Sequence, residues 1–130
     1  MWHRTGFKLV LTGIALSACF AVGLVQAKQL AVTASSSLIR VAELPKPGAQ
    51  TYALIHQGGP FAHEKDGLVF GNRERLLPVQ KRGYYREYTV ATPGSRDRGA
   101  RRIVCGGQAM KPEACYYTGD HYASFRKIAP

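Results

Sequence analysis

The chain has 130 residues, and its 18 Lys and Arg against 8 Asp and Glu give a formal net charge of +10. A chain of this length buries one hydrophobic core, which excludes a multidomain enzyme. The excess of cationic side chains favours polyanions or anionic membrane surfaces as partners, although charge alone does not choose between them.

The N-terminal 27 residues have the pattern of a secretory signal peptide. A basic segment, residues 1–8, precedes an uncharged and mostly apolar run over residues 9–25, and the small residue Ala27 suits a signal peptidase. We expect cleavage after Ala27 and secretion of the remainder to an extracellular or periplasmic site. Two alternatives stay open. One is an uncleaved anchor, since the 17 residues of this run are at the short limit for a spanning helix, and the other is a lipidated Cys19 in the lipoprotein-like segment 16–19.

The segment 28–44 is small, polar and weakly patterned, and it predicts a flexible lead-in to a folded domain at 45–130. Within that domain, Gln50–Gln57 has the apolar spacing of a helix. Residues 58–60, Gly-Gly-Pro, are expected to end this helix because neither residue type continues one readily.

Short segments rich in aromatic and β-branched residues follow and predict strands. They are Leu68–Phe70, Tyr84–Thr92, Arg101–Cys105, Tyr116–Tyr117 and Ser124–Ile128. One N-terminal helix followed by such strands predicts an α+β fold, in which the helix packs on a single antiparallel β-sheet with one exposed face. Because side chains alternate along a strand, Tyr88 faces one side and Glu87 the other, where the outward-facing Arg102 can join Glu87.

Cys105 and Cys115 are the only cysteines outside the predicted signal peptide. In an oxidising compartment they can form a disulfide that closes the segment between them, worth about 2–3 kcal/mol in the chain-entropy description. The alternative is a buried thiol at Cys105 and an unrelated Cys115. Two cysteines with no His beside them do not predict a zinc site, and we expect the protein to use no metal and no cofactor.

A carboxylate, an imidazole and a cluster of guanidinium groups stand out in the second half of the chain. Glu87 can accept a proton, His121 can donate one, and Arg98 and Arg102 can stabilise negative charge on phosphorus. Together these groups predict cleavage of a phosphodiester without a metal. Each also has a structural alternative: a partly buried His, a solvent-facing strand Glu, and a basic patch that binds phosphate backbones without chemistry.

A series of motifs in fixed order gives the sequence a family resemblance. The series consists of Gly59-Pro60-Phe61, Asp66–Phe70, Asn72-Arg73-Glu74, Gly83–Val90, Thr92-Pro93-Gly94, Arg98–Ile103 and Tyr116–Tyr122. It resembles the small secreted guanine-specific ribonucleases of bacteria, the group that includes barnase, and in particular the RNase Sa type. The resemblance covers residues 44–128, nearly the whole expected domain.

The resemblance implies a metal-independent endoribonuclease that cleaves single-stranded RNA on the 3′ side of guanosine through a 2′,3′-cyclic phosphate. By position, Glu87 matches the general base and His121 the general acid. Arg98 and Arg102 match the cations around the scissile phosphate. Glu74, with the main chain of Asn72 and Arg73, matches the group that reads guanine, and Phe70 and Tyr122 resemble the aromatic side chains that line the base and phosphate sites.

Single-stranded RNA is therefore the expected partner of a monomeric protein with no stable membrane association. The resemblance also implies a barstar-like acidic inhibitor in the producing cell, although no residue of this chain shows one. Two rival functions stay open: a basic module that binds RNA or an inhibitor without cutting, and a cationic protein that acts on membranes. Membrane activity would survive the change Glu87→Gln, whereas RNA cleavage would be lost.

Overall fold

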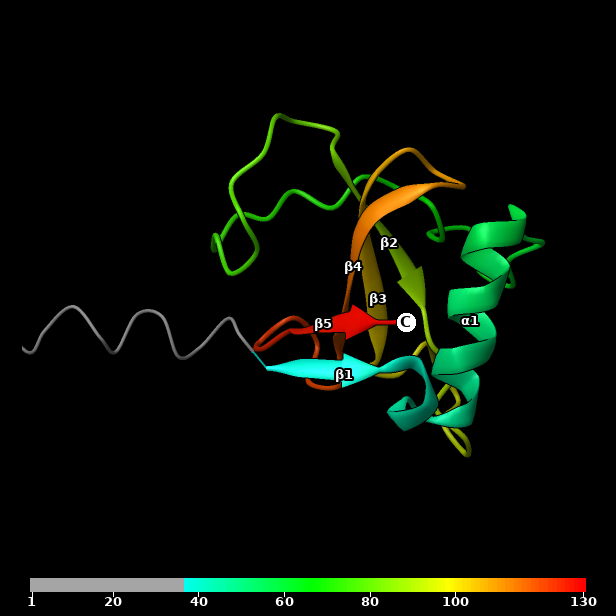
Figure 1. Ribbon diagram of the computed structural model, residues 1–130. Coiled ribbons are helices and arrows are strands. Elements are labelled where there is room, and N and C mark those ends of the chain that lie inside the picture. The colour runs from blue at the N-terminus through cyan, green and yellow to red at the C-terminus, as the bar shows by residue number, and fades with distance from the viewer. Residues whose placement is uncertain (1–36) are drawn as a thin grey trace, which may run out of the picture.

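The computed structural model describes residues 37–130 of the chain, in which one long helix packs on a five-stranded sheet (Figure 1). In chain order, the elements are β1 (Leu38–Arg40), the 3-10 helix η1 (Val41–Glu43), α1 (Lys46–Gln57), β2 (Tyr85–Thr89), β3 (Arg102–Gly107), β4 (Pro112–Thr118) and β5 (Arg126–Ala129). The strands lie in the order β1-β5-β4-β3-β2. The interpretations of residues 1–27 as signal peptide, anchor or lipoprotein segment lie outside the described residues.

The helix α1 begins at Lys46, ahead of the predicted start at Gln50, and ends where the sequence predicted. Pro47 lies in its first turn, where a residue without an N–H removes no helical hydrogen bond. The proline therefore belongs to the helix, which begins before the apolar pattern that starts at Gln50. At the other end Gly58 adopts the left-handed conformation with φ 84°, and its N–H bonds back to the carbonyls of the last turn.

The sheet is mixed, so the prediction of a purely antiparallel sheet is wrong at one edge. β1 pairs in parallel with β5, with Ile39 opposite Ile128, while the other strand pairs of the sheet are antiparallel. β1 belongs to the predicted lead-in 28–44, which is therefore too long: its last residues form β1 and η1. A strand of three residues is too short for the alternation of buried and exposed side chains to be recognised in the sequence. The burial of Ile39 becomes visible only in the folded structure.

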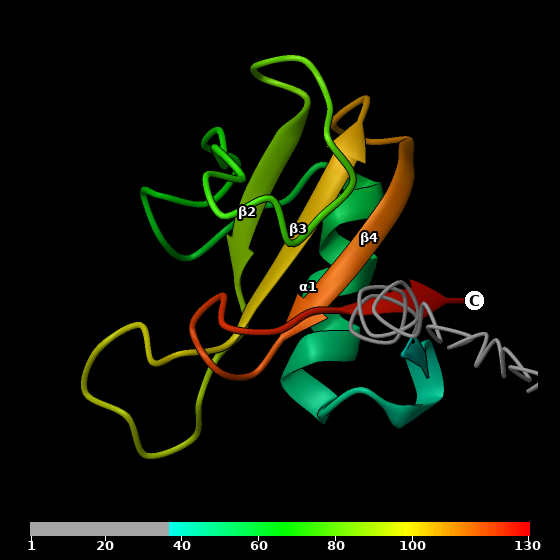
Figure 2. The same cartoon turned by 90° about the vertical axis from the view of Figure 1, so that its left-hand side faces the viewer.

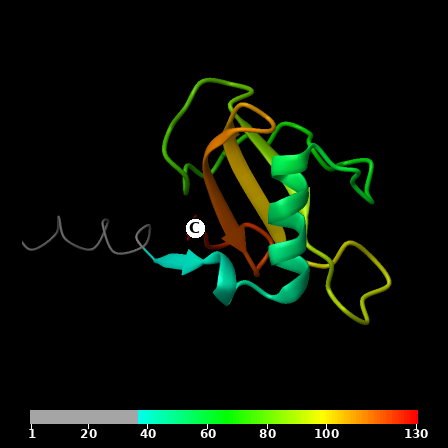
Figure 3. The same ribbon diagram turned by 45° about the vertical axis from the view of Figure 1, so that its right-hand side comes forward.

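Hydrophobic side chains gather on both faces of the sheet. The cluster between the sheet and α1 contains Ile39, Leu44, Ile55, Tyr88, Val90, Ile103, Cys105, Cys115, Tyr117 and Ile128. Figure 3 shows α1 lying across that face of the sheet. The cluster on the opposite face contains Leu77, Tyr85, Val104 and Phe125, with Phe70, Tyr84, Tyr116 and Tyr122 packed against it. The predicted alternation along β2, with Tyr88 and Tyr85 on different faces, is confirmed.

The segment around Leu68–Phe70 forms one regular bridge, between Val69 and Arg86, rather than the full strand that was predicted. Its main chain nevertheless follows the free edge of β2, because Phe70 N–H donates to the Tyr85 carbonyl and Glu87 N–H donates to the Leu68 carbonyl, each at 2.9 Å. The chain then crosses the sheet face opposite α1 before it enters β2 (Figure 2). A loop therefore partly covers the face that was expected to be exposed.

Cys105 and Cys115 form the disulfide, and the alternative of two unrelated thiols is wrong. The two residues lie directly opposite each other on β3 and β4, with their Cα atoms 4.1 Å apart. Both are buried in the cluster beneath α1. The bridge thus fixes together two of the strands that carry the site described below.

Candidate active site

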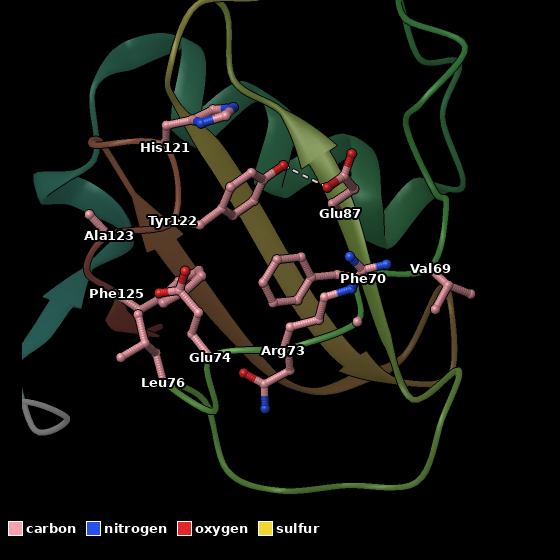
Figure 4. Close-up of a pocket in the computed structure, with 12 residues that line it drawn as sticks. Val69, Phe70, Arg73, Glu74, Leu76, Glu87, His121, Tyr122, Ala123 and Phe125 are labelled. Atoms are coloured by element: carbon pink, nitrogen blue, oxygen red, sulfur yellow. Dashed lines mark hydrogen bonds between the residues drawn. The ribbon is translucent and has the colours of Figure 1, made fainter.

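A pocket of about 480 Å³ opens on the sheet face opposite α1 (Figure 4). It is lined by Val69, Phe70, Gly71, Asn72, Arg73, Glu74, Leu76, Glu87, His121, Tyr122, Ala123 and Phe125. All the site residues predicted from the sequence line this pocket except two arginines: Arg98 contacts Glu87, and Arg102 lies over the ring of Tyr122. Figure 4 shows the Glu87 carboxylate and the His121 ring at separate positions along one rim, with the Tyr122 ring between them.

The Glu87 carboxylate is held by two neighbours. One of its oxygens accepts a 2.6 Å hydrogen bond from the Tyr122 hydroxyl, and the other lies 3.5 Å from a terminal nitrogen of Arg98. Arg98 is itself fixed, since its Nε and one terminal nitrogen donate to the Thr89 hydroxyl at 3.0 and 2.8 Å. A carboxylate oriented in this way keeps acceptor positions on both oxygens for a proton from a ligand.

Arg102 lies on the same face as Glu87, as predicted, but its side chain is buried rather than exposed: only 3% of the residue is accessible. One of its terminal nitrogens donates to the carbonyls of Arg98, Gly99 and Arg101, while its Nε has no partner. Within residues 37–130 no carboxylate forms an ion pair with it. A buried guanidinium whose acceptors are backbone carbonyls rather than a carboxylate suits an anion brought by a ligand.

His121 lies in the loop between β4 and β5, where its own φ is 54° and that of Tyr122 is 71°. Two successive non-glycine residues with positive φ are strained, and such strain collects at functional sites. The conformation is held by His121 N–H, which donates to the Ala100 carbonyl at 3.0 Å, and by Tyr122 N–H, which donates to the Thr118 hydroxyl at 3.1 Å. The strained backbone aims both side chains at the pocket.

The Tyr122 hydroxyl remains a hydrogen-bond donor at neutral pH. Burial and the adjacent Glu87 carboxylate raise the pKa of Tyr122 to about 12. Its ring stacks on Phe70 with centroids 5.1 Å apart, and the Arg102 guanidinium lies 5.9 Å from the ring centroid. Tyr122 thus joins the aromatic wall of the pocket to its charged rim.

Asp120 fixes the loop that carries His121. One of its oxygens accepts from the Thr118 hydroxyl at 2.8 Å and from Ser124 N–H at 2.9 Å, and the other accepts from the Ser124 hydroxyl. These hydrogen bonds, with the Ser124 hydroxyl first, lower the pKa of Asp120 below its ordinary value. Asp120 therefore acts on the site through the loop.

We expect Asp120→Ala to lower kcat/KM by about 10- to 100-fold, because a small displacement of a reacting group carries such a cost. A folded-state pKa below the unfolded value of about 3.9 means that Asp120 stabilises the fold above that pH and ceases to do so as the pH falls through the folded value. In urea unfolding, the free energy of unfolding of the wild type should therefore exceed that of Asp120→Ala at pH 7, and this difference should shrink below about pH 4. Glu64→Ala, which removes an exposed carboxylate outside the loop, serves as the control; an equal loss of activity in both variants contradicts the assignment.

The opposite side of the pocket is built by a loop around Asn72. The Asn72 side chain accepts from Leu77 N–H at 3.1 Å and donates to the Leu77 carbonyl at 3.0 Å, while Arg75 N–H donates to the Asn72 carbonyl. Asn72 therefore shapes the loop with its side chain and leaves Glu74 exposed at the pocket. Among the hydrogen bonds of residues 37–130, none is donated to the Glu74 carboxylate, so it is available to a ligand.

Five pocket residues were not predicted as site residues: Val69, Gly71, Leu76, Ala123 and Phe125. Phe125 packs edge-on against Phe70 with ring centroids 5.9 Å apart and belongs to the buried cluster on this face. Its aromatic character was visible in the sequence, but only the fold shows which face it joins. The other four residues line the pocket because they lie in the same loops as the predicted residues.

In residues 37–130, no group of three or more His, Cys, Asp or Glu side chains is arranged to hold a metal ion. None of the helices in this part of the chain has the length and apolar character that a membrane crossing needs. The chemistry that the pocket offers a ligand is acceptance of a proton by a carboxylate and donation of a proton by an imidazole, beside cations that attract an anion.

A helix packed on a mixed five-stranded sheet that carries the pocket of Glu87 and His121 is a fold shared with solved structures of small ribonucleases. A family model described as ribonuclease matches residues 27–129. Guanyl-specific ribonuclease Sa of Kitasatospora aureofaciens is 50% identical over 93 residues, which cover 72% of this chain and 94% of that protein. The chain belongs to the microbial guanine-specific ribonuclease family.

Further comparisons agree. Guanyl-specific ribonuclease Sa3 of the same organism is 56% identical over 85 residues, which are 65% of this chain and 58% of that protein, so the chain spans little more than half of that relative. A solved structure of ribonuclease Sa2 with mononucleotides is 45% identical, has a TM-score of 0.69, and is matched over 74% of this chain and 96% of its own. Another, of ribonuclease Sa2 with guanosine-2′-cyclophosphate, has a TM-score of 0.67 at 44% identity and is matched over 74% and 98%.

Proposed function

We propose that the protein is an endoribonuclease that cleaves single-stranded RNA on the 3′ side of guanosine through a 2′,3′-cyclic phosphate, using no metal. The observation that carries the proposal is one pocket lined by Glu87 and His121 at one end and by Glu74 at the other. The names of the relatives support it, since these are guanyl-specific ribonucleases and one solved neighbour holds a guanosine cyclophosphate.

In the proposed reaction, the 2′-OH of guanosine attacks the phosphorus while Glu87 accepts its proton. His121 donates a proton to the departing 5′ oxygen, so that the 5′-OH of the next nucleotide leaves and a cyclic phosphate forms. Arg98 and Arg102 stabilise the negative charge that develops on the phosphoryl oxygens. Because the nucleophile is the 2′-OH, DNA is expected to bind without being cut.

The proposed base specificity rests on Glu74. A carboxylate can accept hydrogen bonds from both N1–H and N2–H of guanine, whereas adenine does not offer two donors in that arrangement. The stacked pair Phe70 and Tyr122 provides an aromatic surface beside the base and phosphate. Single-stranded RNA leaves the Watson–Crick edge of the base free for such a reading.

Product analysis tests this function directly. The purified protein is incubated in a chelator with GpU, with ApU and with the deoxy analogue of GpU. We expect guanosine 2′,3′-cyclic phosphate and uridine from GpU, slow cleavage of ApU and no cleavage of the deoxy compound. If GpU yields no cyclic phosphate, the enzyme proposal is rejected in favour of a module that binds RNA or an inhibitor.

The proposal extends to location and partners. A secreted enzyme agrees with the disulfide between Cys105 and Cys115, because such bonds persist in oxidising compartments. We propose that it acts as a monomer, as the family resemblance implies. A basic nuclease would also endanger the cell that makes it, and the family resemblance suggests an acidic barstar-like inhibitor as the partner that prevents this.

A further inference from the structure

A second cleft lies against the proposed active-site pocket. It has a volume of about 610 Å³ and shares the strip Val69–Arg73 with the first pocket. Its other wall is formed by Gln80–Gly83, and Tyr85 completes it. In Figure 4 the loop that leads from Leu76 back to β2 runs past Arg73, on the side away from His121.

The two hollows differ in charge. The first is lined by the carboxylates of Glu74 and Glu87 beside Arg73, whereas the second adds the cations Lys81 and Arg82 to Arg73 and is lined by no carboxylate. The three cations are exposed, and none of them forms an ion pair with another residue of the described part, 37–130. Converging cations without a protein counter-ion favour an anion supplied by a ligand.

The wall that carries Lys81 and Arg82 is held in place by hydrogen bonds. The Tyr84 N–H donates to the Lys81 carbonyl at 3.1 Å, which closes a turn around Gly83. The Tyr85 hydroxyl donates to the Pro78 carbonyl at 2.6 Å, and the Tyr85 ring is buried in the cluster on this sheet face. The two cations therefore project from a fixed turn next to the start of β2.

The positions of the proposed reacting groups decide which part of an RNA chain can reach this cleft. Glu87 and His121 line the first pocket and not the second. If they flank the phosphate on the 3′ side of guanosine, the next nucleotide leaves past His121. The strip shared with the second cleft lies on the side of the pocket away from His121 (Figure 4), where the RNA on the 5′ side of the same guanosine can continue.

We infer that the cleft lined by Arg73, Lys81 and Arg82 is a subsite for the phosphate on the 5′ side of the guanosine. The inference rests on the proposed function, which defines where the guanosine lies. The subsite does not recognise the upstream base and takes no part in the reaction. Its cations contact the 5′ phosphate, a charged group that guanosine and GpU lack. Longer RNA chains would therefore be better substrates than GpU.

The test compares cleavage of GpU, pGpU and GpUp by the wild type and by Lys81→Gln/Arg82→Gln at low salt. The wild type should cleave pGpU about three- to tenfold more efficiently than GpU, as expected for contacts with exposed cations. The double variant should lose this advantage while GpU and GpUp are cleaved as before. Lys46→Gln/Lys127→Gln, which removes the same charge at exposed positions outside both clefts, should keep it.

The other outcomes overturn the inference. The subsite is contradicted if the wild type cleaves pGpU no better than GpU, or if Lys81→Gln/Arg82→Gln still prefers pGpU. A loss confined to GpUp places the contact downstream, and an equal loss in the control pair shows general charge attraction. If GpU is not cut at all, the proposed function fails, but the subsite can still be tested by calorimetric binding of guanosine and 5′-GMP. The subsite requires that 5′-GMP binds more tightly than guanosine to the wild type and to the control pair. It also requires that this difference disappears in Lys81→Gln/Arg82→Gln.

Discussion

Glu87→Gln and His121→Ala are each expected to lower kcat/KM for GpU by about two to four decades, the usual contribution of one proton-transfer partner. Gln keeps the shape of Glu87 and an acceptor for the Tyr122 hydroxyl, so the pocket should persist while the group can no longer take a proton. Ala at position 121 removes the imidazole from an exposed side chain and leaves the backbone contact to Ala100 intact. Both effects should therefore be chemical rather than structural.

Steady-state kinetics over a pH series checks this pair. The wild type should give a bell-shaped profile, because the active form needs an ionised carboxylate and a protonated imidazole. Glu87→Gln should lose the acidic limb and His121→Ala the alkaline limb. The matched controls are Glu64→Gln and His56→Ala, two exposed residues outside the pocket; activity within about threefold of wild type in either site variant would contradict the assigned roles, given the size expected for proton transfer.

The parts of the site that lie on regular strands could be predicted from the sequence. Side chains alternate along β2, so the run of aromatic residues around Glu87 fixed its face without any structure. Arg102 could be assigned to that face in the same way, since it lies opposite Thr89 in the neighbouring strand. Its burial could not be predicted, because the carbonyls that surround its guanidinium come from the irregular loop before β3.

The remaining parts depend on contacts between distant segments. The parallel pairing of β1 with β5 joins residues far apart in the chain, and neither strand carries a local signal for it. The positive φ values of His121 and Tyr122 are imposed by Ala100 and Thr118 and are opposed by local preference. Local sequence patterns therefore indicated which side chains share a face of the sheet, but not the loop geometry that orients His121 and Tyr122.

Glu74→Gln is expected to lower kcat/KM for GpU by about 5- to 150-fold, the size of one bidentate base contact of roughly 1–3 kcal/mol. ApU should be cleaved as by the wild type, since adenine gains nothing from this carboxylate. The ratio of the two substrates is therefore the informative measurement. Gln presents one donor where Glu presents an acceptor, so the guanine edge would meet a mismatched group rather than an empty space.

A second variant separates reading of the base from shaping of the loop. Asn72→Ala removes both side-chain bonds to Leu77, so the loop loses its support and Glu74 its position. Activity on GpU should fall in both variants. Only Asn72→Ala should also lower thermal stability, because the N–H and the carbonyl of buried Leu77 lose their hydrogen bonds to the Asn72 side chain. A GpU to ApU ratio that is unchanged in Glu74→Gln would mean that guanine is recognised by the main chain alone, and the exposed carboxylate would then have no part in specificity.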